Sequence, residues 1–179
     1  MAFPTMACLI ATPASAPIPM TDPITPSPLV PAPIVLGWRE RLALPQLGIA
    51  QLKAKLDTGA RSSALHVETL DSFLRDGAVW LRFTVRAGRH PAARVCCEAP
   101  ALDRRVVTDT GGHRTERWFI RSEILLAGRR FEADINLTDR RHMLFPMLLG
   151  RSALHGRFAV DPARAYTQPR LPSVTTDRP

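Results

Sequence analysis

Residues 52–65 read LKAKLDTGARSSAL. Apolar and charged side chains alternate at the start of this stretch, with Leu52, Ala54 and Leu56 facing one way and two lysines facing the other. The alternation predicts a half-buried strand, and the glycine two positions after Asp57 predicts the turn that ends it. A carboxylic acid at the end of an apolar strand is less solvated than one on an open surface, and such an environment favours acid–base chemistry. We therefore interpret Asp57 as half of a catalytic carboxylate pair.

Composition favours one domain with a possible appendage. The chain has 179 residues, of which 45% are hydrophobic and only 6% aromatic, so the core must be built mainly from Leu, Val, Ile and Ala. Lys and Arg number 24 against 16 Asp and Glu, a net charge of +8. This balance favours an anionic partner such as nucleic acid, phosphate or acidic peptide, but an Arg-rich proteome explains it equally well. The cations are scattered and no nucleic-acid motif is present, so a nucleic-acid partner is not favoured.

The cysteines and histidines predict neither a disulfide framework nor a metal site. Cys8, Cys96 and Cys97 are too few for a framework, and adjacent cysteines rarely bridge each other. Cys96 and Cys97 are expected to pack as small residues in a strand. No Cys-x-x-Cys or His-x-x-x-His spacing exists and the five histidines are widely separated, so we expect no metal and no cofactor. Free cysteines fit a reduced, cytoplasmic compartment.

Residues 1–33 are rich in Pro, Ala, Thr and Ser and contain no Lys or Arg. Repeated prolines oppose helix and sheet, so a disordered tail that leans towards polyproline II is expected. A signal peptide would need a cationic start and a longer apolar run. Weak export through this segment, or an over-extended translation start, stays open as an alternative. No membrane partner is expected.

The folded domain is expected over residues 34–168, followed by a flexible tail over 169–179. The Pro-rich chain after Tyr166 is expected to be loose. Short strands separated by turns, without long helices, indicate an all-β barrel or sandwich. The expected strands cover residues 38–44, 49–57, 79–86, 93–98, 104–108, 115–126, 131–137, 147–150 and 157–161.

Three local features complete the secondary-structure prediction. The spacing of Leu70, Phe73 and Leu74 suggests one helical turn, closed by Asp76-Gly77. In the strand that follows, the side chains expected to face the core are Val79, Leu81, Phe83 and Val85. A short helix is expected after Gly150, ending at Gly156.

Several motifs in order carry a family resemblance: GWRE at 37–40, KAK at 53–55, DTGARSSALH at 57–66, CEAP at 97–100 and LLGR at 148–151. Together they resemble the retropepsin-type aspartic peptidases. The resemblance is closest to the bacterial family labelled "ATP-dependent zinc protease", which is described as retropepsin-like. It covers about residues 34–168 and implies a single-lobe acid-protease barrel with one short C-terminal helix. The chain has no G-x-x-x-x-G-K-[ST] loop and no zinc-ligand spacing, so we reject an ATP- or zinc-dependent activity.

The resemblance implies an aspartic endopeptidase with Asp57, Thr58 and Gly59 as its catalytic residues. Two carboxylates about 3 Å apart share one proton, so that one activates water while the other polarises the scissile carbonyl. Gly59 lets the backbone approach and donate amides to the carboxylate, and Thr58 hydrogen-bonds across to the matching loop. Ala60 is expected to line the substrate site. The strand 148–150 is expected to pack behind the loop.

A second Asp-Thr-Gly triplet occurs at Asp109-Thr110-Gly111, but a polar stretch follows it and no second apolar-apolar-Gly-Arg segment supports it. This position in the chain corresponds to the flap of retropepsins, so Gly111 and Gly112 are expected to lie in a flap hairpin over substrate. The second carboxylate is then expected from Asp57 of another copy, in a C2 homodimer.

Arg61 departs from the retroviral pattern, in which an acidic residue at this position pairs with the arginine equivalent to Arg151. Arg61 is expected either to point to solvent or to pair with Glu68 or Asp71. The sharper hypothesis is that Arg61 and Arg151 together bind an acidic substrate. Genes of related proteins are associated with glutamate ligases, which makes glutamate-tailed proteins plausible substrates.

Two other functions remain open from the sequence. The first is a non-catalytic module that keeps the fold and binds peptide in its cleft. The second is a basic nucleic-acid-binding β-barrel, whose binding would fall steeply with salt and would not depend on Asp57.

Overall fold

The computed structural model describes residues 32–88, 93–108, 111–139 and 144–169. The chain divides after residue 31, and the unit that starts at Ala32 contains all the elements named below. They are β1 (Ile34–Gly37), β2 (Arg39–Leu44), the 3₁₀ turn η1 (Pro45–Leu47), β3 (Ile49–Asp57), β4 (Ser63–His66), β5 (Thr69–Arg75), β6 (Ala78–Arg86), β7 (Arg94–Pro100), β8 (Asp103–Thr108), β9 (Arg114–Leu126), β10 (Arg129–Thr138), β11 (Met147–Gly150), α1 (Arg151–Leu154) and β12 (Phe158–Asp161).

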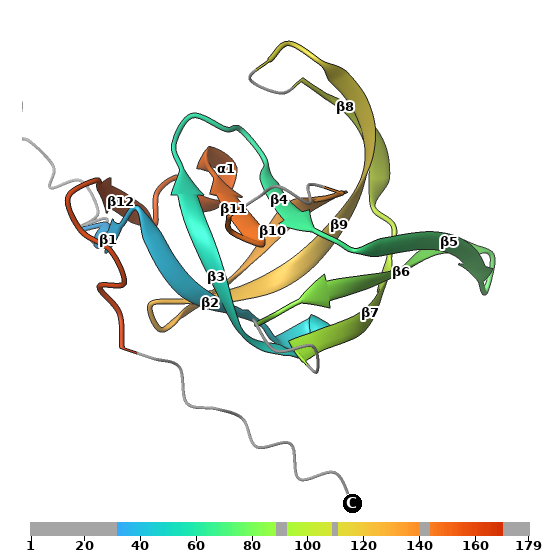
Figure 1. The fold of residues 1–179 in the computed structure, drawn as a ribbon, viewed down its shortest axis with the longest axis horizontal. Helices are drawn as coiled ribbons and strands as arrows, with labels where there is room; N and C mark the ends of the chain where they lie inside the picture. The colour runs from blue at the N-terminus through green and yellow to red at the C-terminus, as the bar shows by residue number, and fades with distance from the viewer. Residues whose placement is uncertain (1–31, 89–92, 109–110, 140–143, 170–179) are drawn as a thin grey trace, which may run out of the picture. The chain divides into compact units, whose positions relative to one another are not determined.

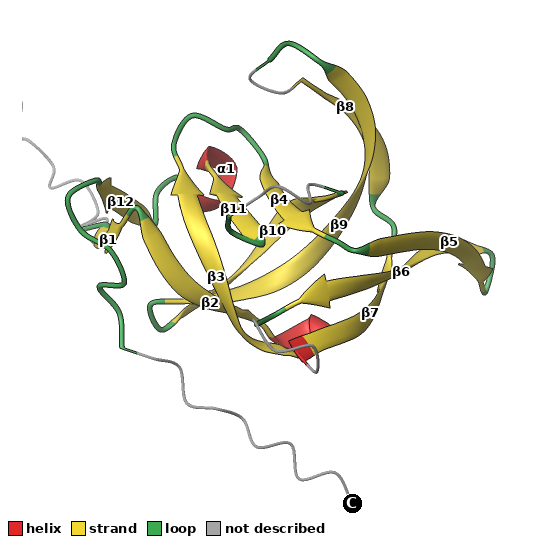
Figure 2. Ribbon diagram, viewed as in Figure 1, coloured by secondary structure: helices red, strands yellow, loops and turns green. Residues whose placement is uncertain are grey.

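A ring of strands forms the body of the domain (Figure 1). The largest sheet runs β10-β4-β11-β3-β2-β9-β8, and β10 also pairs with β9, which brings the sheet back on itself as a near-barrel. Strands β5, β6 and β7 form a separate three-stranded sheet, and β1 pairs with β12 in parallel. Strands dominate, and α1 and η1 are the helical segments among the described residues (Figure 2). The predicted all-β fold with one short C-terminal helix is therefore confirmed.

The core forms because the strands alternate as their sequences do. In β3, Leu52, Ala54 and Leu56 are buried while the intervening lysines are exposed. Leu65 of β4 and Leu149 of β11 are fully buried against the same interior. Burial of apolar surface of this kind is the main term that stabilises a small β domain.

The predicted helical turn is wrong, because residues 69–75 form strand β5, paired antiparallel with β6. The connecting Asp76 and Gly77 both have positive φ, 53° and 78°. Two left-handed residues in a two-residue loop are typical of the hairpin turn whose twist matches that of the strands. Asp-Gly is therefore a hairpin turn here and not a helix stop. The prediction that Val79 faces the core is also wrong: it is 37% exposed, near the outer end of this hairpin.

A buried acid ties the C-terminal segment to the start of the domain. Glu40 is 0% exposed. Its Oε1 accepts hydrogen bonds from the Gly37 amide (2.9 Å), the Thr167 amide (2.8 Å) and the Thr167 hydroxyl (2.7 Å). The Tyr166 amide also donates to the Arg39 carbonyl (2.8 Å). The chain is thus held through Thr167, and the prediction of loose chain directly after Tyr166 is wrong.

Candidate active site

The loop that follows β3 is folded around the carboxylate of Asp57. Asp57 Oδ1 accepts hydrogen bonds from the amides of Gly59 (3.0 Å) and Ala60 (3.1 Å). A Cβ at position 59 would lie 3.3 Å from the same oxygen, so a glycine there leaves room for the close turn. Asp57 is half-buried and Thr58 is exposed. The loop therefore presents an oriented carboxylate, held by backbone donors, at the end of a buried strand.

Strand β11 supports this loop from behind. It runs parallel to β3, with Gly150 in register with Asp57. The Arg151 amide donates to the Ala60 carbonyl (2.8 Å) and the Ser152 amide donates to the Arg61 carbonyl (3.1 Å). The start of α1 therefore fixes the far side of the loop, as expected for the 148–150 strand.

Gly150 is required here for space. Its φ and ψ of −83° and 172° are open to any residue. A Cβ at this position would lie 2.5 Å from both the carbonyl carbon and the oxygen of Ser62. Backbone atoms cannot rotate out of the way as a side chain can, so the loop and β11 approach this closely only with glycine at position 150.

A polar network under the loop was not predicted. Asn136 of β10 is 1% exposed, and its Nδ2 donates to the Ser63 carbonyl (2.6 Å). The Ser63 hydroxyl accepts from the Gly150 amide (3.2 Å), and an Arg117 guanidinium nitrogen donates to Asn136 Oδ1 (3.2 Å). The network joins β9, β10 and the loop. Sequence alternation gives no signal for it, because Asn136 lies between the apolar Ile135 and Leu137, at a position where alternation predicts a solvent-facing side chain.

The structure brings the backbones of Arg61 and Arg151 together through the two hydrogen bonds of α1, and both residues are exposed. Neither pairs with a carboxylate among the residues that the structure describes. Glu68, one of the two partners considered for Arg61, is bound instead by Arg86 (2.5 Å) and Arg94 (2.5 Å). The alternative in which Arg61 points to solvent fits its exposure.

The predicted flap lies in the connection between β8 and β9. Strands β8 and β9 form a long hairpin that curves away from the ring of strands (Figure 1). Gly111 and Gly112 are exposed between these strands. Asp109 and Thr110 lie outside the described residues, so the structure does not address them as a second catalytic triplet.

The described residues provide neither a metal site nor a membrane-spanning helix. No group of three His, Cys, Asp or Glu side chains there is close enough to hold a metal ion. Within the same residues, no helix has the length and apolar character needed to span a membrane.

Residues 35–171 match the family described as RimB-like, with the name retropepsin-like aspartic endopeptidase RimB. The chain belongs to this family. The resemblance drawn from the sequence motifs is therefore confirmed.

Relatives of this RimB-like chain include longer proteins. It is 35% identical over 132 residues to a probable alpha-L-glutamate ligase of Desulfotalea psychrophila, a match that covers 72% of this chain and 28% of that protein. It is 38% identical over 134 residues to a probable alpha-L-glutamate ligase of Parasynechococcus marenigrum, covering 74% and 29%. The chain therefore spans less than a third of the length of these curated relatives.

A solved structure supports the fold of the RimB-like chain. A crystal structure of a Legionella pneumophila protein of unknown function (DUF785) matches with a TM-score of 0.64 and 30% sequence identity. The match covers 76% of this chain and 98% of the Legionella chain.

Proposed function

We propose that this RimB-like chain is an endopeptidase whose catalytic pair consists of Asp57 from each of two identical subunits. The observation that carries the proposal is the Asp57 loop, in which two amides hold one carboxylate oxygen while β11 packs behind. A loop of this construction occurs once among the described residues, and a second copy of the chain would supply the second carboxylate. A C2 axis beside the exposed Thr58 supplies it with the same geometry.

In such a pair the two carboxylates lie about 3 Å apart and share one proton. The charged carboxylate accepts a proton from the attacking water, and the protonated one donates a hydrogen bond to the scissile carbonyl oxygen. The amides of Gly59 and Ala60 keep each Asp57 oriented throughout. Thr58 would contact the partner loop and fix the separation of the two carboxylates.

We further propose that acidic peptides are preferred. Arg61 and Arg151 are exposed beside the Asp57 loop and have no carboxylate partner in the described part of the chain. Guanidinium groups bind carboxylates through paired hydrogen bonds, so two of them at the edge of a peptide site favour Glu or Asp in the substrate. The relatives named probable alpha-L-glutamate ligases add support, since a domain similar to this chain occurs in proteins named for handling glutamate.

The direct test is hydrolysis of a glutamate-rich peptide by wild type and by Asp57→Asn. We expect the variant to lose activity by about 10³-fold or more while keeping its fold, because the shared proton is lost. Sedimentation should give twice the chain mass of 19.8 kDa at concentrations where activity is measured. An active strict monomer would refute the two-subunit site.

The substrate preference is tested separately with matched glutamate and glutamine peptides. Wild type should favour the glutamate peptide, and the double variant Arg61→Ala, Arg151→Ala should lose that preference while it still cleaves the glutamine peptide. Arg130→Ala, which removes an exposed arginine on β10, is the control. Equal turnover of both peptides by wild type would exclude the acidic preference.

A further inference from the structure

Strands β2 and β3 carry a strip of positive charge on their outer face. The chain has two lysines, Lys53 and Lys55, and both lie on the exposed side of β3. In the antiparallel register, Arg41 of β2 lies opposite Lys53, and Arg39 lies opposite Lys55. We call these residues (Arg39, Arg41, Lys53 and Lys55) the basic strip.

The basic strip is electrostatically unfavourable as the protein stands. Like charges directly opposite on neighbouring strands repel. None of the strip's four cations pairs with a carboxylate among residues 32–88, 93–108, 111–139 and 144–169. Elsewhere on the same domain, arginines gather around carboxylates, as Arg105 and Arg121 do around Asp134. Repulsion within the strip would be relieved by an anion from outside the domain.

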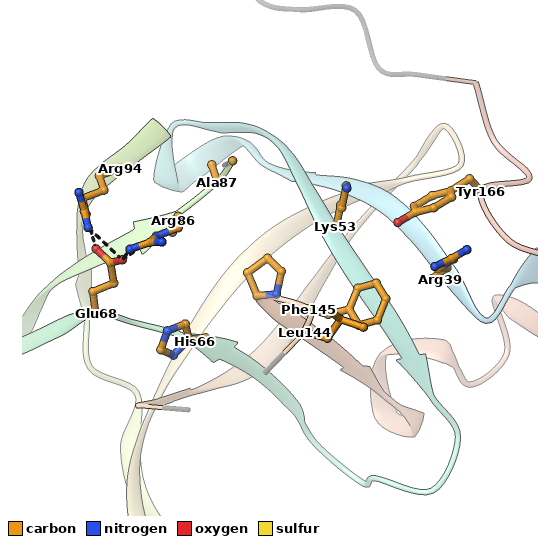
Figure 3. A pocket seen from close by; sticks show the side chains of 12 residues that line it. Arg39, Lys53, His66, Glu68, Arg86, Ala87, Arg94, Leu144, Phe145 and Tyr166 are labelled. Atoms are coloured by element: carbon orange, nitrogen blue, oxygen red, sulfur yellow. Dashed lines mark hydrogen bonds and ion pairs between the residues drawn. The ribbon is translucent and has the colours of Figure 1, made fainter. Parts of the chain in front are cut away.

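A cavity of about 830 Å³ lies beside the strip. Figure 3 shows Arg39, Lys53 and Tyr166 on one side of it. On the other side Arg86 and Arg94 hold the carboxylate of Glu68 between them, the one acidic side chain among the described lining residues. The segment that includes Leu144, Phe145 and Pro146 gives the cavity an apolar floor between these two cationic walls.

Arg39 is pre-organised at this cavity by two aromatic rings, and its Nε is left without a hydrogen-bond acceptor among the described residues. Its guanidinium carbon lies 4.7 Å from the ring centre of Trp38 and 5.1 Å from that of Tyr166. Its Nε is buried and has no hydrogen-bond partner in the described structure. A buried donor left unpaired is costly, and stacking between two rings restricts the rotation by which the guanidinium could find water. The arrangement suits a guanidinium that donates hydrogen bonds to a bound anion.

We propose that this cavity and the basic strip form a binding site for an acidic peptide segment, separate from the Asp57 loop. Lys53 lies four residues before Asp57, roughly 13 Å along the strand. Same-face side chains of an extended peptide repeat every 6.6–6.8 Å or so, which equals the repeat of Lys53 and Lys55 on β3. A peptide chain can lie over the apolar floor while its carboxylates reach the cationic walls. The choice of peptide over other polyanions rests on the proposed peptidase function.

The two lysines provide a direct readout. Reductive methylation with ¹³C-formaldehyde keeps their charge and gives each one a separate NMR signal, which Lys53→Arg and Lys55→Arg assign. The measurement uses the full chain with Asp57→Asn, so that bound peptide is not consumed. An octapeptide of glutamate should shift the Lys53 signal saturably, and added salt should weaken the effect. The matched glutamine octapeptide should leave the signal in place.

Charge-reversed variants then locate the site by calorimetry with the same glutamate peptide. Lys53→Glu should weaken binding about fivefold or more, because it replaces an attraction with a repulsion. Arg39→Lys keeps the charge but loses the stacked, planar group, and it should weaken binding by a smaller factor. Arg130→Glu changes the net charge as Lys53→Glu does but lies outside the cavity lining, so it should bind as wild type.

The inference is overturned by an unmoved Lys53 signal, by an equal response to the glutamine peptide, or by an equal loss in Arg130→Glu. Tighter binding of a single-stranded oligonucleotide that displaces the peptide would also overturn it, in favour of a nucleic-acid site. Peptide binding at Lys53 by a protein that never hydrolyses peptides would refute the proposed function and leave the site standing. Hydrolysis with no response at Lys53 would do the reverse.

Discussion

Gly150→Ala is the substitution with the clearest predicted consequence. The new methyl carbon would lie 2.5 Å from the carbonyl carbon and oxygen of Ser62, and 2.9 Å from the carbonyl oxygen of Arg61. Comfortable separations between such atoms are about 3.5–4.0 Å. All three neighbours belong to the backbone of the loop after Asp57, so the loop itself must move by about 1 Å.

The size of the effect follows from that displacement. Overpacking lowers the free energy of unfolding by about 1–3 kcal/mol. Because the atoms that the new methyl group meets belong to the backbone, we expect Gly150→Ala to lie at or above the upper end of this range. For a domain of this length the loss corresponds to a melting temperature lower by about 10 °C. Misplacement of a catalytic group by about 1 Å costs on the order of 10²-fold in rate. We therefore expect both a lower melting temperature and a lower rate of peptide hydrolysis per folded molecule.

Gly128→Ala is the matched control. Gly128 lies in the β9–β10 turn with a φ of 74°, and a Cβ there meets nothing within 4 Å. Like any Gly→Ala change, the control lowers the conformational entropy of the unfolded chain. It also forces an alanine into a left-handed backbone conformation, which lowers the free energy of unfolding by about 1–2 kcal/mol. It should lower stability yet keep wild-type turnover. If Gly150→Ala melts within about 3 °C of wild type and turns over normally, then packing of β11 does not position Asp57.

Three further predictions concern pH and the network under the loop. Burial, and secondarily the neighbouring Cys96, raise the pKa of Cys97 to about 11 from its ordinary 9.0. Because the thiol of the unfolded chain then ionises at lower pH than that of the folded chain, the free energy of unfolding should fall as pH rises between these two values. Urea unfolding of Cys97→Ala should lack that fall. Hydrogen bonds from Arg94, and then from Arg86, lower the pKa of Glu68 below its ordinary 4.5. The contribution of ionised Glu68 to the free energy of unfolding is therefore present above pH 4.5 and is lost as pH falls below that value. Acid unfolding of Glu68→Gln that matches that of wild type would contradict this. Asn136→Ala should cost about 1–3 kcal/mol of unfolding free energy, because it removes the buried hydrogen bond to the Ser63 carbonyl. Hydrogen exchange in residues 58–63 should then speed up, whereas unchanged exchange would show that the network does not hold the loop.

Much of the site could be predicted because its signals are local. The alternation before Asp57 and the glycine after it define a strand and a turn within a few residues. The small residue at Gly150 and its apolar neighbours pointed to close packing behind the loop, and the structure gives the reason in the 2.5 Å approach to Ser62. Motifs that need glycine at fixed positions can therefore be recognised from the sequence alone.

The sequence of residues 69–75, predicted to contain a helical turn and found as strand β5, fits either structure by its apolar spacing. Leu70, Phe73 and Leu74 satisfy helical spacing, but Leu70 and Leu74 also satisfy strand spacing. Pairing with β6 decides between them, and that pairing depends on the Asp76-Gly77 turn. The dipeptide is itself a strong hairpin signal, so the information was present in the turn and not in the apolar spacing.

Contacts between distant segments had no local signature. The parallel pairing of β4 with β10 joins Ser63 to Ile135, far apart in the chain, and it places Asn136 beside the Asp57 loop. Alternation alone assigns Asn136 to solvent, since it cannot show that the near-barrel brings another segment over that face. The basic strip is similar, because only the register between β2 and β3 reveals that the arginines and lysines oppose each other.

The buried Glu40 has a consequence for where this domain can be cut. Deleting residues 162–168 would spare every strand, yet it would remove three donors to the Glu40 carboxylate, which water cannot reach: the amide and hydroxyl of Thr167 and the amide of Gln168. Leaving a charged acceptor short of partners costs on the order of 1–3 kcal/mol or more, enough to make a shortened domain marginal. The same deletion would remove Tyr166 and with it part of one wall of the cavity. The smallest independently folding unit therefore ends beyond Thr167, several residues after the last strand. A single proteolytic cut before Tyr166 would lower the stability of the domain and alter the cavity at the same time.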